Sequence, residues 1–370
     1  KCGGGWKMLM ECLAAGRAIS LPSSALASSW VSTYGVTGYS NVRKQFGIPL
    51  SKMQGVQEKL ASMTYHSILI DSALRLSNAI LDSGEKPSVL SAIMKQQCTE
   101  RARKVLDGGM DIYAGSGICL GENNFIAKFY KSAPIGITVE GSNTLTRSLI
   151  IFGQGLNKSH PYIGDIVTNI QEDDKKEFSK NINAMITHTL KCYFNSLFTL
   201  TTFKGDQTSL LDKLNTSFAN MVNIVSLMGG QLKKEQIISG DMADIFSNIY
   251  LGHALKYSFE RNGLDPKIKE ICLKMLNNET LESIEKVKKN LPLHLKLLLK
   301  GHTNTSKIEI SSDEIDFLSN VVWKDQKLNK YIEEQIVVEN NILEKIKKCN
   351  ENPTDELIDD IVQVGEYDIN

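Results

Sequence analysis

The sequence predicts an all-α fold of two helical domains, on three observations. Apolar residues recur at spacings of three, four and seven, which is typical of one helix face, and strand-like alternation is weak. Glycine and proline residues separate these periodic segments. At roughly 150 residues per domain, a chain of 370 residues has room for about two domains.

Residues 1–156 are predicted to form a four-helix bundle, because long helices joined by short breaks are typical of that architecture. Pro22 is expected to kink the first helix. Glycine pairs are expected to end the third helix after residue 107 and the last helix at Gly153 and Gly155. The predicted helices are 6–34, 52–81, 88–107, a short one at 124–131, and one that begins after Ser142 and includes Leu145, Leu149 and Phe152.

A change in composition marks the predicted boundary to a second helical domain. Residues 157–180 are rich in Asn, Asp, Glu and Lys and are interpreted as a linker, followed by the second domain at 181–340. Residues 341–370 are polar and acidic, and we expect a weakly held tail. Helices are expected at 179–203, 208–228, 233–261, 265–276 and 279–289, with core residues Phe194, Phe198, Phe203, Met221, Met228, Phe246 and Tyr250.

The bulk properties argue against several classes of function. Lys+Arg and Asp+Glu both number 42, so the charge balance does not indicate a nucleic-acid partner. The seven cysteines and six histidines are scattered without zinc-ligand spacing, so no metal site is expected, and the thiols suit a reducing, cytoplasmic compartment. No run of 18 apolar residues predicts a membrane span. Lysine-rich helix faces at 231–235 and 285–289 leave open a peripheral association with the inner membrane face.

Four short motifs, in order, resemble the C-terminal helical domain of the acyl-CoA dehydrogenases. They are Leu-Ala-Ala-Gly-Arg at 13–17, Tyr-Ser-Asn-Val-Arg-Lys-Gln-Phe-Gly-Ile-Pro-Leu at 39–50, Asp-Ile-Tyr-Ala-Gly-Ser-Gly at 111–117, and Val-Glu-Gly-Ser-Asn-Thr-Leu-Thr-Arg at 139–147. The later residues Phe-Gly-Gln-Gly at 152–155 and His-Pro-Tyr at 160–162 resemble large bacterial acyl-CoA dehydrogenases of fatty-acid degradation. The resemblance implies the family's C-terminal four-helix bundle followed by a second helical domain.

The resemblance implies that Glu140 is the catalytic base. By spacing alone Glu140 is a solvated carboxylate just before a helix N-terminus, where the helix dipole favours negative charge. Some family members instead carry the base immediately before the substrate-facing arginine, but that position here is Gly16. By the same resemblance, Arg17 and Gly141 contact the CoA thioester substrate.

The resemblance also implies FAD as the cofactor. Arg43 would bind the flavin pyrophosphate of a neighbouring subunit, although by itself it reads as a surface cation at a helix end. Asp111 stands where the family usually has Gln, and Thr144 also replaces a Gln. The cofactor-binding residues implied by the resemblance are Arg43, Phe46, Gln54, Asp111, Gly115, Ser142 and Thr144.

The function implied is conversion of a fatty acyl-CoA to its trans-2-enoyl-CoA in fatty acid β-oxidation, with electrons passed to an electron-transfer flavoprotein by a homo-oligomer (a dimer or tetramer). An acyl-CoA oxidase and a non-catalytic helical remnant or assembly module stay open as alternatives. The chain begins at Lys1 with a glycine run at 3–5. We therefore expect an N-terminally truncated fragment without the family's N-terminal helical and β-domains, inactive by itself.

Overall fold

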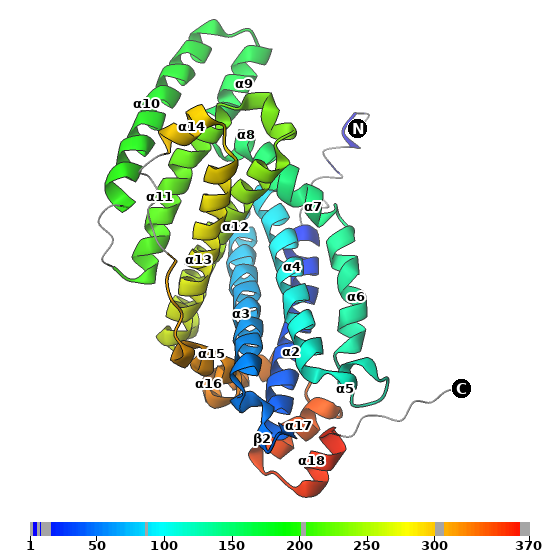
Figure 1. The fold of residues 1–370 in the computed structure, drawn as a ribbon. Helices are drawn as coiled ribbons and strands as arrows, with labels where there is room; N and C mark the ends of the chain where they lie inside the picture. The colour runs from blue at the N-terminus through cyan, green and yellow to red at the C-terminus, as the bar shows by residue number, and fades with distance from the viewer. Residues whose placement is uncertain are drawn as a thin grey trace.

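The computed structural model describes residues 3–5, 8, 16–85, 88–200, 205–299 and 307–362. Helices dominate this part of the chain, in agreement with the predicted all-α class (Figure 1). The strands within it are β1 (Lys44–Gln45) and β2 (Ile48–Pro49), an antiparallel hairpin in which Lys44 pairs with Pro49 and Gln45 with Ile48. The 3-10 turn η2 (Leu50–Lys52) follows the hairpin.

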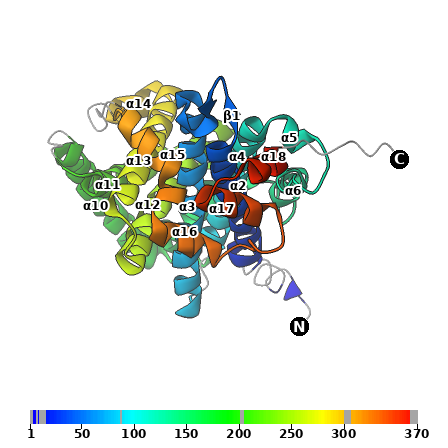
Figure 2. The same ribbon diagram turned by 90° about the horizontal axis from the view of Figure 1, so that it is seen from below.

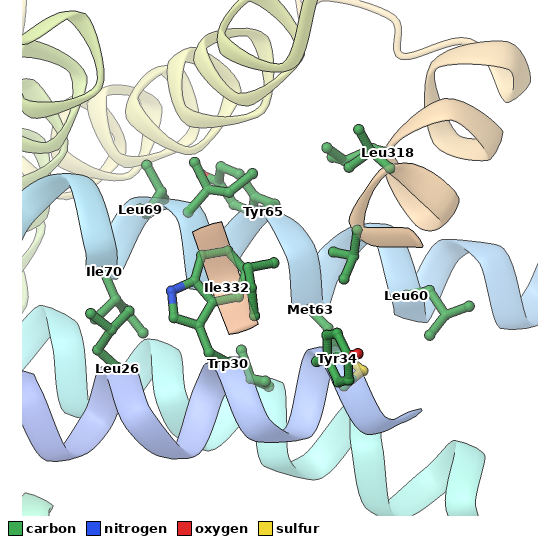
Figure 3. Close-up of a cluster of buried hydrophobic side chains, with 14 of the residues drawn as sticks. Leu26, Trp30, Tyr34, Leu60, Met63, Tyr65, Leu69, Ile70, Leu318 and Ile332 are labelled. Atoms are coloured by element: carbon green, nitrogen blue, oxygen red, sulfur yellow. The ribbon is translucent and has the colours of Figure 1, made fainter. Parts of the chain in front are cut away.

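Three long helices, α2 (Leu21–Val42), α3 (Gln54–Asp82) and α4 (Ser88–Tyr113), form the centre of the molecule. The buried cluster that they form with neighbouring helices is apolar and aromatic; Figure 3 shows Trp30, Tyr34, Met63 and Tyr65 in it. A π-helical segment, η1 (Gly16–Ser20), precedes α2. Pro22 is expected to kink a longer helix. It lies instead in the first turn of α2, where a residue needs no N–H for the hydrogen bonds of the helix.

The third helix does not end at residue 107, because its two glycines serve packing. A Cβ at Gly109 would lie 2.5 Å from Ile126 and one at Gly108 3.3 Å from Met63, so the glycines let neighbouring side chains approach the helix. α4 therefore continues to Tyr113, followed by α5 (Gly115–Ile118) and α6 (Ala127–Thr138).

The last helix predicted for the first domain also continues past its expected end. It starts as α7 (Asn143–Leu145), widens into the π-helix η3 (Thr146–Gln154) and continues as α8 (Gly155–Ser159). A Cβ at Gly155 would lie 3.1 Å from Val89, so this glycine also marks close packing instead of a helix end.

The following segment is helical where a linker is expected. α9 (Ile163–Gln171) and the start of α10 (Lys175–Leu200) occupy most of 157–180. The next elements are α11 (Gln207–Ser226), η4 (Gly229–Lys233), α12 (Gln236–Asn262), α13 (Pro266–Asn290) and α14 (Leu293–Leu298).

The helix α13 replaces the two helices expected at 265–276 and 279–289. Asn277, a polar residue at the expected break, is fully buried, and its Nδ2 donates to the backbone and side-chain oxygens of Gln207, both at 3.0 Å. Asn278 Nδ2 donates to the Ile308 carbonyl oxygen at 2.7 Å. Tertiary hydrogen bonds therefore explain polar residues that look like a helix break in the sequence.

The core predicted for the second domain is confirmed for some of its members. Met221 and Met228 are buried, and Phe246 and Tyr250 are partly buried against the core. Phe194 is 54% exposed, so its assignment to the core is wrong. Phe203 and the side chain of Phe198 lie outside the described residues.

The end of the described chain is helical and packs on the first bundle. α15 (Ser312–Lys324), α16 (Gln326–Glu333), α17 (Ile342–Glu351) and α18 (Asp355–Val362) gather at the end of the molecule seen in Figure 2, with α17 against α2. Leu343, Ile346 and Cys349 are buried there. The expectation of a weakly held tail is therefore wrong for 342–362, while 363–370 lie outside the described residues.

Buried side chains form two apolar clusters, and α12 and α13 contribute to both. The N-terminal half of α12 packs with η3, and its C-terminal half packs with the bundle of α2, α3 and α4. The predicted division of the chain at 157–180 stays a prediction.

Candidate active site

A tight turn between α6 and α7 carries Glu140. Glu140 has φ 55° and Gly141 has φ 97°, so two successive residues are left-handed. Such a conformation disfavours a side chain on either residue, and glycine removes that cost at the second position. A Cβ at Gly141 would also lie 3.2 Å from Nη2 of Arg17. The turn therefore needs glycine at 141 and holds Glu140 in a strained conformation.

Arg17 reaches this turn from η1, 123 positions earlier in the chain. Its side chain is 8% exposed, and its Nε donates to the backbone oxygen of Glu140 at 2.8 Å. The structure thus brings together Arg17, Glu140 and Gly141, the three residues to which the sequence assigns catalysis and substrate contact.

Lys95 of α4 also contacts the turn, although no sequence motif singles it out. It is fully buried, and its Nζ donates to the Gly141 backbone oxygen and to Asn143 Oδ1, both at 2.6 Å. Asn143 Nδ2 in turn donates to Thr99 Oγ1 and to Glu100 Oε1, both at 2.9 Å. In the sequence Lys95 directly follows the stretch Val-Leu-Ser-Ala-Ile-Met at 89–94 and precedes Gln96 and Gln97, so no local pattern marks it as a buried residue.

The electrostatic setting of Lys95 is unusual for a lysine. Burial lowers the pKa of Lys95 to about 8; the neighbouring Arg17 guanidinium lowers it too, while the carboxylates of Glu100 and Glu140 raise it. The ammonium is therefore charged at neutral pH but near its titration point.

The Glu140 carboxylate is placed to accept a proton. Oε2 is buried and has no hydrogen-bond partner within the described part of the chain. Ile135, Val139 and Leu145, close to it in sequence, are large apolar side chains that are 60%, 41% and 51% exposed. A carboxylate oxygen without a hydrogen-bond partner can act as a base toward a weakly acidic C–H group that lies against it.

The predicted cofactor residues fall into two groups. Ser142 and Thr144 are exposed and lie in the same turn region as Glu140. The remaining residues lie where α2 ends, α3 begins and α4 ends (Figure 1): Arg43, Phe46, Gln54, Asp111 and Gly115. The 22 residues of α2, about 33 Å at 1.5 Å per residue, separate the two groups.

The second group is largely uncovered. Phe46 is 94% exposed and has φ 51°, and Gln54 and Gly115 are exposed. Arg43 is half-buried at the C-terminus of α2. Asp111 forms an ion pair with Lys59 at 3.1 Å, so a cation balances its charge.

Other kinds of site are not found in the described ranges. Within them, no group of three or more His, Cys, Asp and Glu side chains is placed to hold a metal ion. No helix among the described residues is long and apolar enough to cross a bilayer.

Two family models match the chain. "Acyl-CoA dehydrogenase, C-terminal domain" matches residues 3–153, and "Acyl-CoA dehydrogenase, C-terminal, bacterial type" matches residues 157–350. The short-chain specific acyl-CoA dehydrogenase of mouse mitochondria is 31% identical over 151 residues, which is 40% of this chain and 35% of that protein. The pig protein is 30% identical over 152 residues, with the same coverage. The chain therefore spans about a third of the length of these relatives.

Solved structures share the fold. An acyl-CoA dehydrogenase complexed with FAD from Bacillus anthracis superposes with a TM-score of 0.66 at 19% identity, over 87% of this chain and 57% of that one. Arabidopsis thaliana acyl-CoA oxidase 1 superposes with a TM-score of 0.54 at 11% identity, over 91% and 53%. At these identities the likeness concerns the fold alone.

Proposed function

The chain belongs to the acyl-CoA dehydrogenase family, and we propose that it provides the catalytic base of an enzyme that dehydrogenates fatty acyl-CoA to trans-2-enoyl-CoA. The observation that carries this proposal is the carboxylate of Glu140, whose Oε2 is buried and unpaired among the described residues. A hydrogen α to a thioester carbonyl is weakly acidic, so its removal needs a positioned, poorly solvated base. Glu140 takes this proton.

Arg17 and Gly141 define the direction from which Glu140 acts. The bond from Arg17 Nε to the Glu140 carbonyl oxygen holds the backbone of the base. With that oxygen held inward, the thioester can approach the turn from the side of the exposed apolar residues Ile135, Val139 and Leu145. The uncovered apolar surface is suited to an acyl chain, because burying it is favourable.

The residues available in this chain fit FAD. The exposed hydroxyls of Ser142 and Thr144 beside the base can bond to polar groups of a flavin, and the guanidinium of Arg43 suits phosphate oxygens. FAD, when bound, accepts the hydride that leaves the β-carbon. The exposure of these side chains and the hydrogen-bond donors that they carry therefore support FAD as the cofactor.

The separation of the two groups supports a homo-oligomer. Arg43 and Glu140 lie at opposite ends of α2, about 33 Å of helix apart, so we place them at different cofactor molecules. Arg43 and Phe46 would then help to hold the FAD that serves the base of the partner subunit.

An electron-transfer flavoprotein is the proposed acceptor, and oxygen, as in an oxidase, is the rival. Reducing the flavin anaerobically with acyl-CoA and then admitting air separates them. Slow reoxidation is expected for a dehydrogenase, whereas reoxidation as fast as turnover would identify an oxidase.

The proposal is tested by Glu140→Gln in the complete gene product. Turnover is expected to fall below about one per cent while FAD content and thioester affinity stay near wild type, because the base acts in the transition state. Glu122→Gln, at an exposed loop position, is the matched control and should keep full activity. Activity retained by Glu140→Gln would contradict the proposal, and wild-type protein without flavin would favour a non-catalytic module. The 370 residues expressed alone are expected to be inactive.

A further inference from the structure

The turn that carries Glu140 is held by two buried cations, and only one of them belongs to the residues that the sequence assigns. Arg17 Nε binds the carbonyl oxygen of Glu140, and Lys95 Nζ binds the carbonyl oxygen of Gly141. We propose that Lys95 is a positioning residue, which fixes the turn at Glu140 and Gly141 and thereby the direction of the base carboxylate. This inference rests on the proposed function.

The backbone of the turn requires such a constraint. Two successive residues have positive φ, 55° at Glu140 and 97° at Gly141. A non-glycine residue in this region is strained and persists only where the surroundings over-determine its conformation. Rotation of either peptide would turn one of the two bonded carbonyl oxygens away from its cation. The two bonds therefore select one orientation of the peptides on both sides of Gly141.

Lys95 also ties the turn to the start of the next helix. Its Nζ bonds to Asn143 Oδ1, and Asn143 is the first residue of α7. The amide group of Asn143 is itself bonded to Thr99 and Glu100, one helical turn further along α4. Residues of α4 therefore hold the turn at two points, the carbonyl oxygen of Gly141 and the side chain of Asn143 at the start of α7.

Simple packing does not explain a lysine at this position. Lys95 is 0% exposed, and burying an ammonium is unfavourable unless acceptors replace the lost water. The acceptors that the described structure supplies, Gly141 O and Asn143 Oδ1, both belong to the turn region. A methionine would occupy a similar volume without this desolvation, so the lysine is explained by what it holds.

The charge of Lys95 gives the role a signature in the pH profile. The ionisable groups facing it are Arg17 from η1, Glu100 on its own helix and Glu140 in the turn, and burial with these neighbours brings the pKa of Lys95 to about 8. As pH rises through that value the ammonium loses its proton, and its hydrogen bonds weaken. Catalytic turnover should therefore decline above about pH 8 in the wild-type enzyme.

Lys95→Met in the complete gene product, loaded with FAD, tests the proposal. We expect kcat to fall about 10- to 100-fold, because a charge-assisted hydrogen bond that holds the turn is lost. The KM for acyl-CoA and the FAD content should change less than about twofold. The decline above about pH 8 should disappear. Lys128→Met, an exposed lysine on α6, is the matched control and should resemble wild type in every measurement.

A second variant covers the case in which Lys95→Met does not fold. Asn143→Ala removes one acceptor of Lys95 and leaves the ammonium in place, so a smaller loss of kcat is expected with the alkaline decline retained. Unchanged kcat in a folded Lys95→Met variant overturns the proposal. A reduced kcat with the wild-type pH profile also overturns it, because that result indicates a structural role alone. Wild-type protein without acyl-CoA turnover, or full activity of Glu140→Gln, overturns the proposed function itself and this inference with it.

Discussion

The two ends of α2 are built in different ways. At its N-terminal end, Arg17, Lys95 and Asn143 are buried and hydrogen-bonded around the Glu140 turn. At its C-terminal end, Phe46 is 94% exposed on a short hairpin. The comparison indicates that this chain by itself holds the turn of the proposed base in place, whereas the proposed cofactor contacts at the other end need a surface from outside the described chain.

Two glycines with positive φ allow the ends to be compared directly. Gly141→Ala should cost stability by about 1–3 kcal/mol and reduce kcat about 100-fold or more, because the residue is strained at φ 97° and its Cβ would press on Arg17. Gly47→Ala, at φ 82° with no atom within 4 Å of the new Cβ, carries strain without a contact. It should cost about 1 kcal/mol and leave kcat nearly unchanged. Thermal unfolding and steady-state kinetics measure both; equal losses of kcat would remove the distinction between the ends.

The two arginines provide a second comparison. Arg43→Ala should weaken FAD binding about 10- to 100-fold and loosen the oligomer, since it removes a proposed charge-assisted contact across subunits. Arg17→Met should keep FAD and assembly and lower kcat, because Arg17 holds the base instead. Flavin-to-protein ratio and sedimentation are measured together. If Arg43→Ala changes neither, Arg43 does not bind the cofactor.

Sequence reasoning predicts the features that depend on local spacing. The helix expected at 52–81 is observed as α3 (Gln54–Asp82), because its apolar stripe is a property of consecutive turns. Arg17, Glu140 and Gly141, which the motifs assign to one site, lie at one turn in the structure, and their roles stay a prediction.

The remaining features depend on contacts between distant residues. Lys95 donates to a carbonyl oxygen 46 positions away, and Asn277 Nδ2 donates to Gln207, 70 positions away. The glycines at 108 and 109 look like a helix end in the sequence but accommodate Met63 and Ile126. In each case a residue type that is unfavourable locally is explained by a tertiary contact, which no local pattern can reveal.

The framework between the two ends should respond to acid. Arg101 of α4 is 4% exposed and pairs with Glu279 of α13 at 2.7 Å. Burial raises the pKa of the Glu279 carboxyl, but the charge and hydrogen bonds of Arg101 outweigh it and lower that pKa to about 2. A depressed carboxyl pKa means that this contribution to stability is present above about pH 4.5 and is lost as the pH falls toward about 2.

Glu279→Gln should therefore destabilise the fold at neutral pH and flatten the fall in stability between about pH 4.5 and 2. Glu285→Gln, with a side chain 62% exposed on the same helix, is the control and should keep the wild-type pH dependence. Urea unfolding across this range is the measurement. An unchanged acid dependence in Glu279→Gln would show that other carboxylates dominate.

The smallest expected change in stability is at Phe46, where substitution also tests the difference between the two ends of α2. In the described chain this side chain is 94% exposed and its backbone is left-handed, so it adds strain without burial. Phe46→Asn should raise the free energy of unfolding of the chain by about 0.5–1 kcal/mol, since asparagine tolerates that conformation. The same change should lower FAD content and weaken the oligomer, because the aromatic contact would be lost there.

Ile48→Ser, at an exposed strand position without a positive φ, is the control and should give no gain in stability. For Phe46→Asn we therefore expect a gain in stability together with a loss of bound FAD. A stability gain with full FAD retention would show that Phe46 does not contact the cofactor, and that this end of α2 has another role.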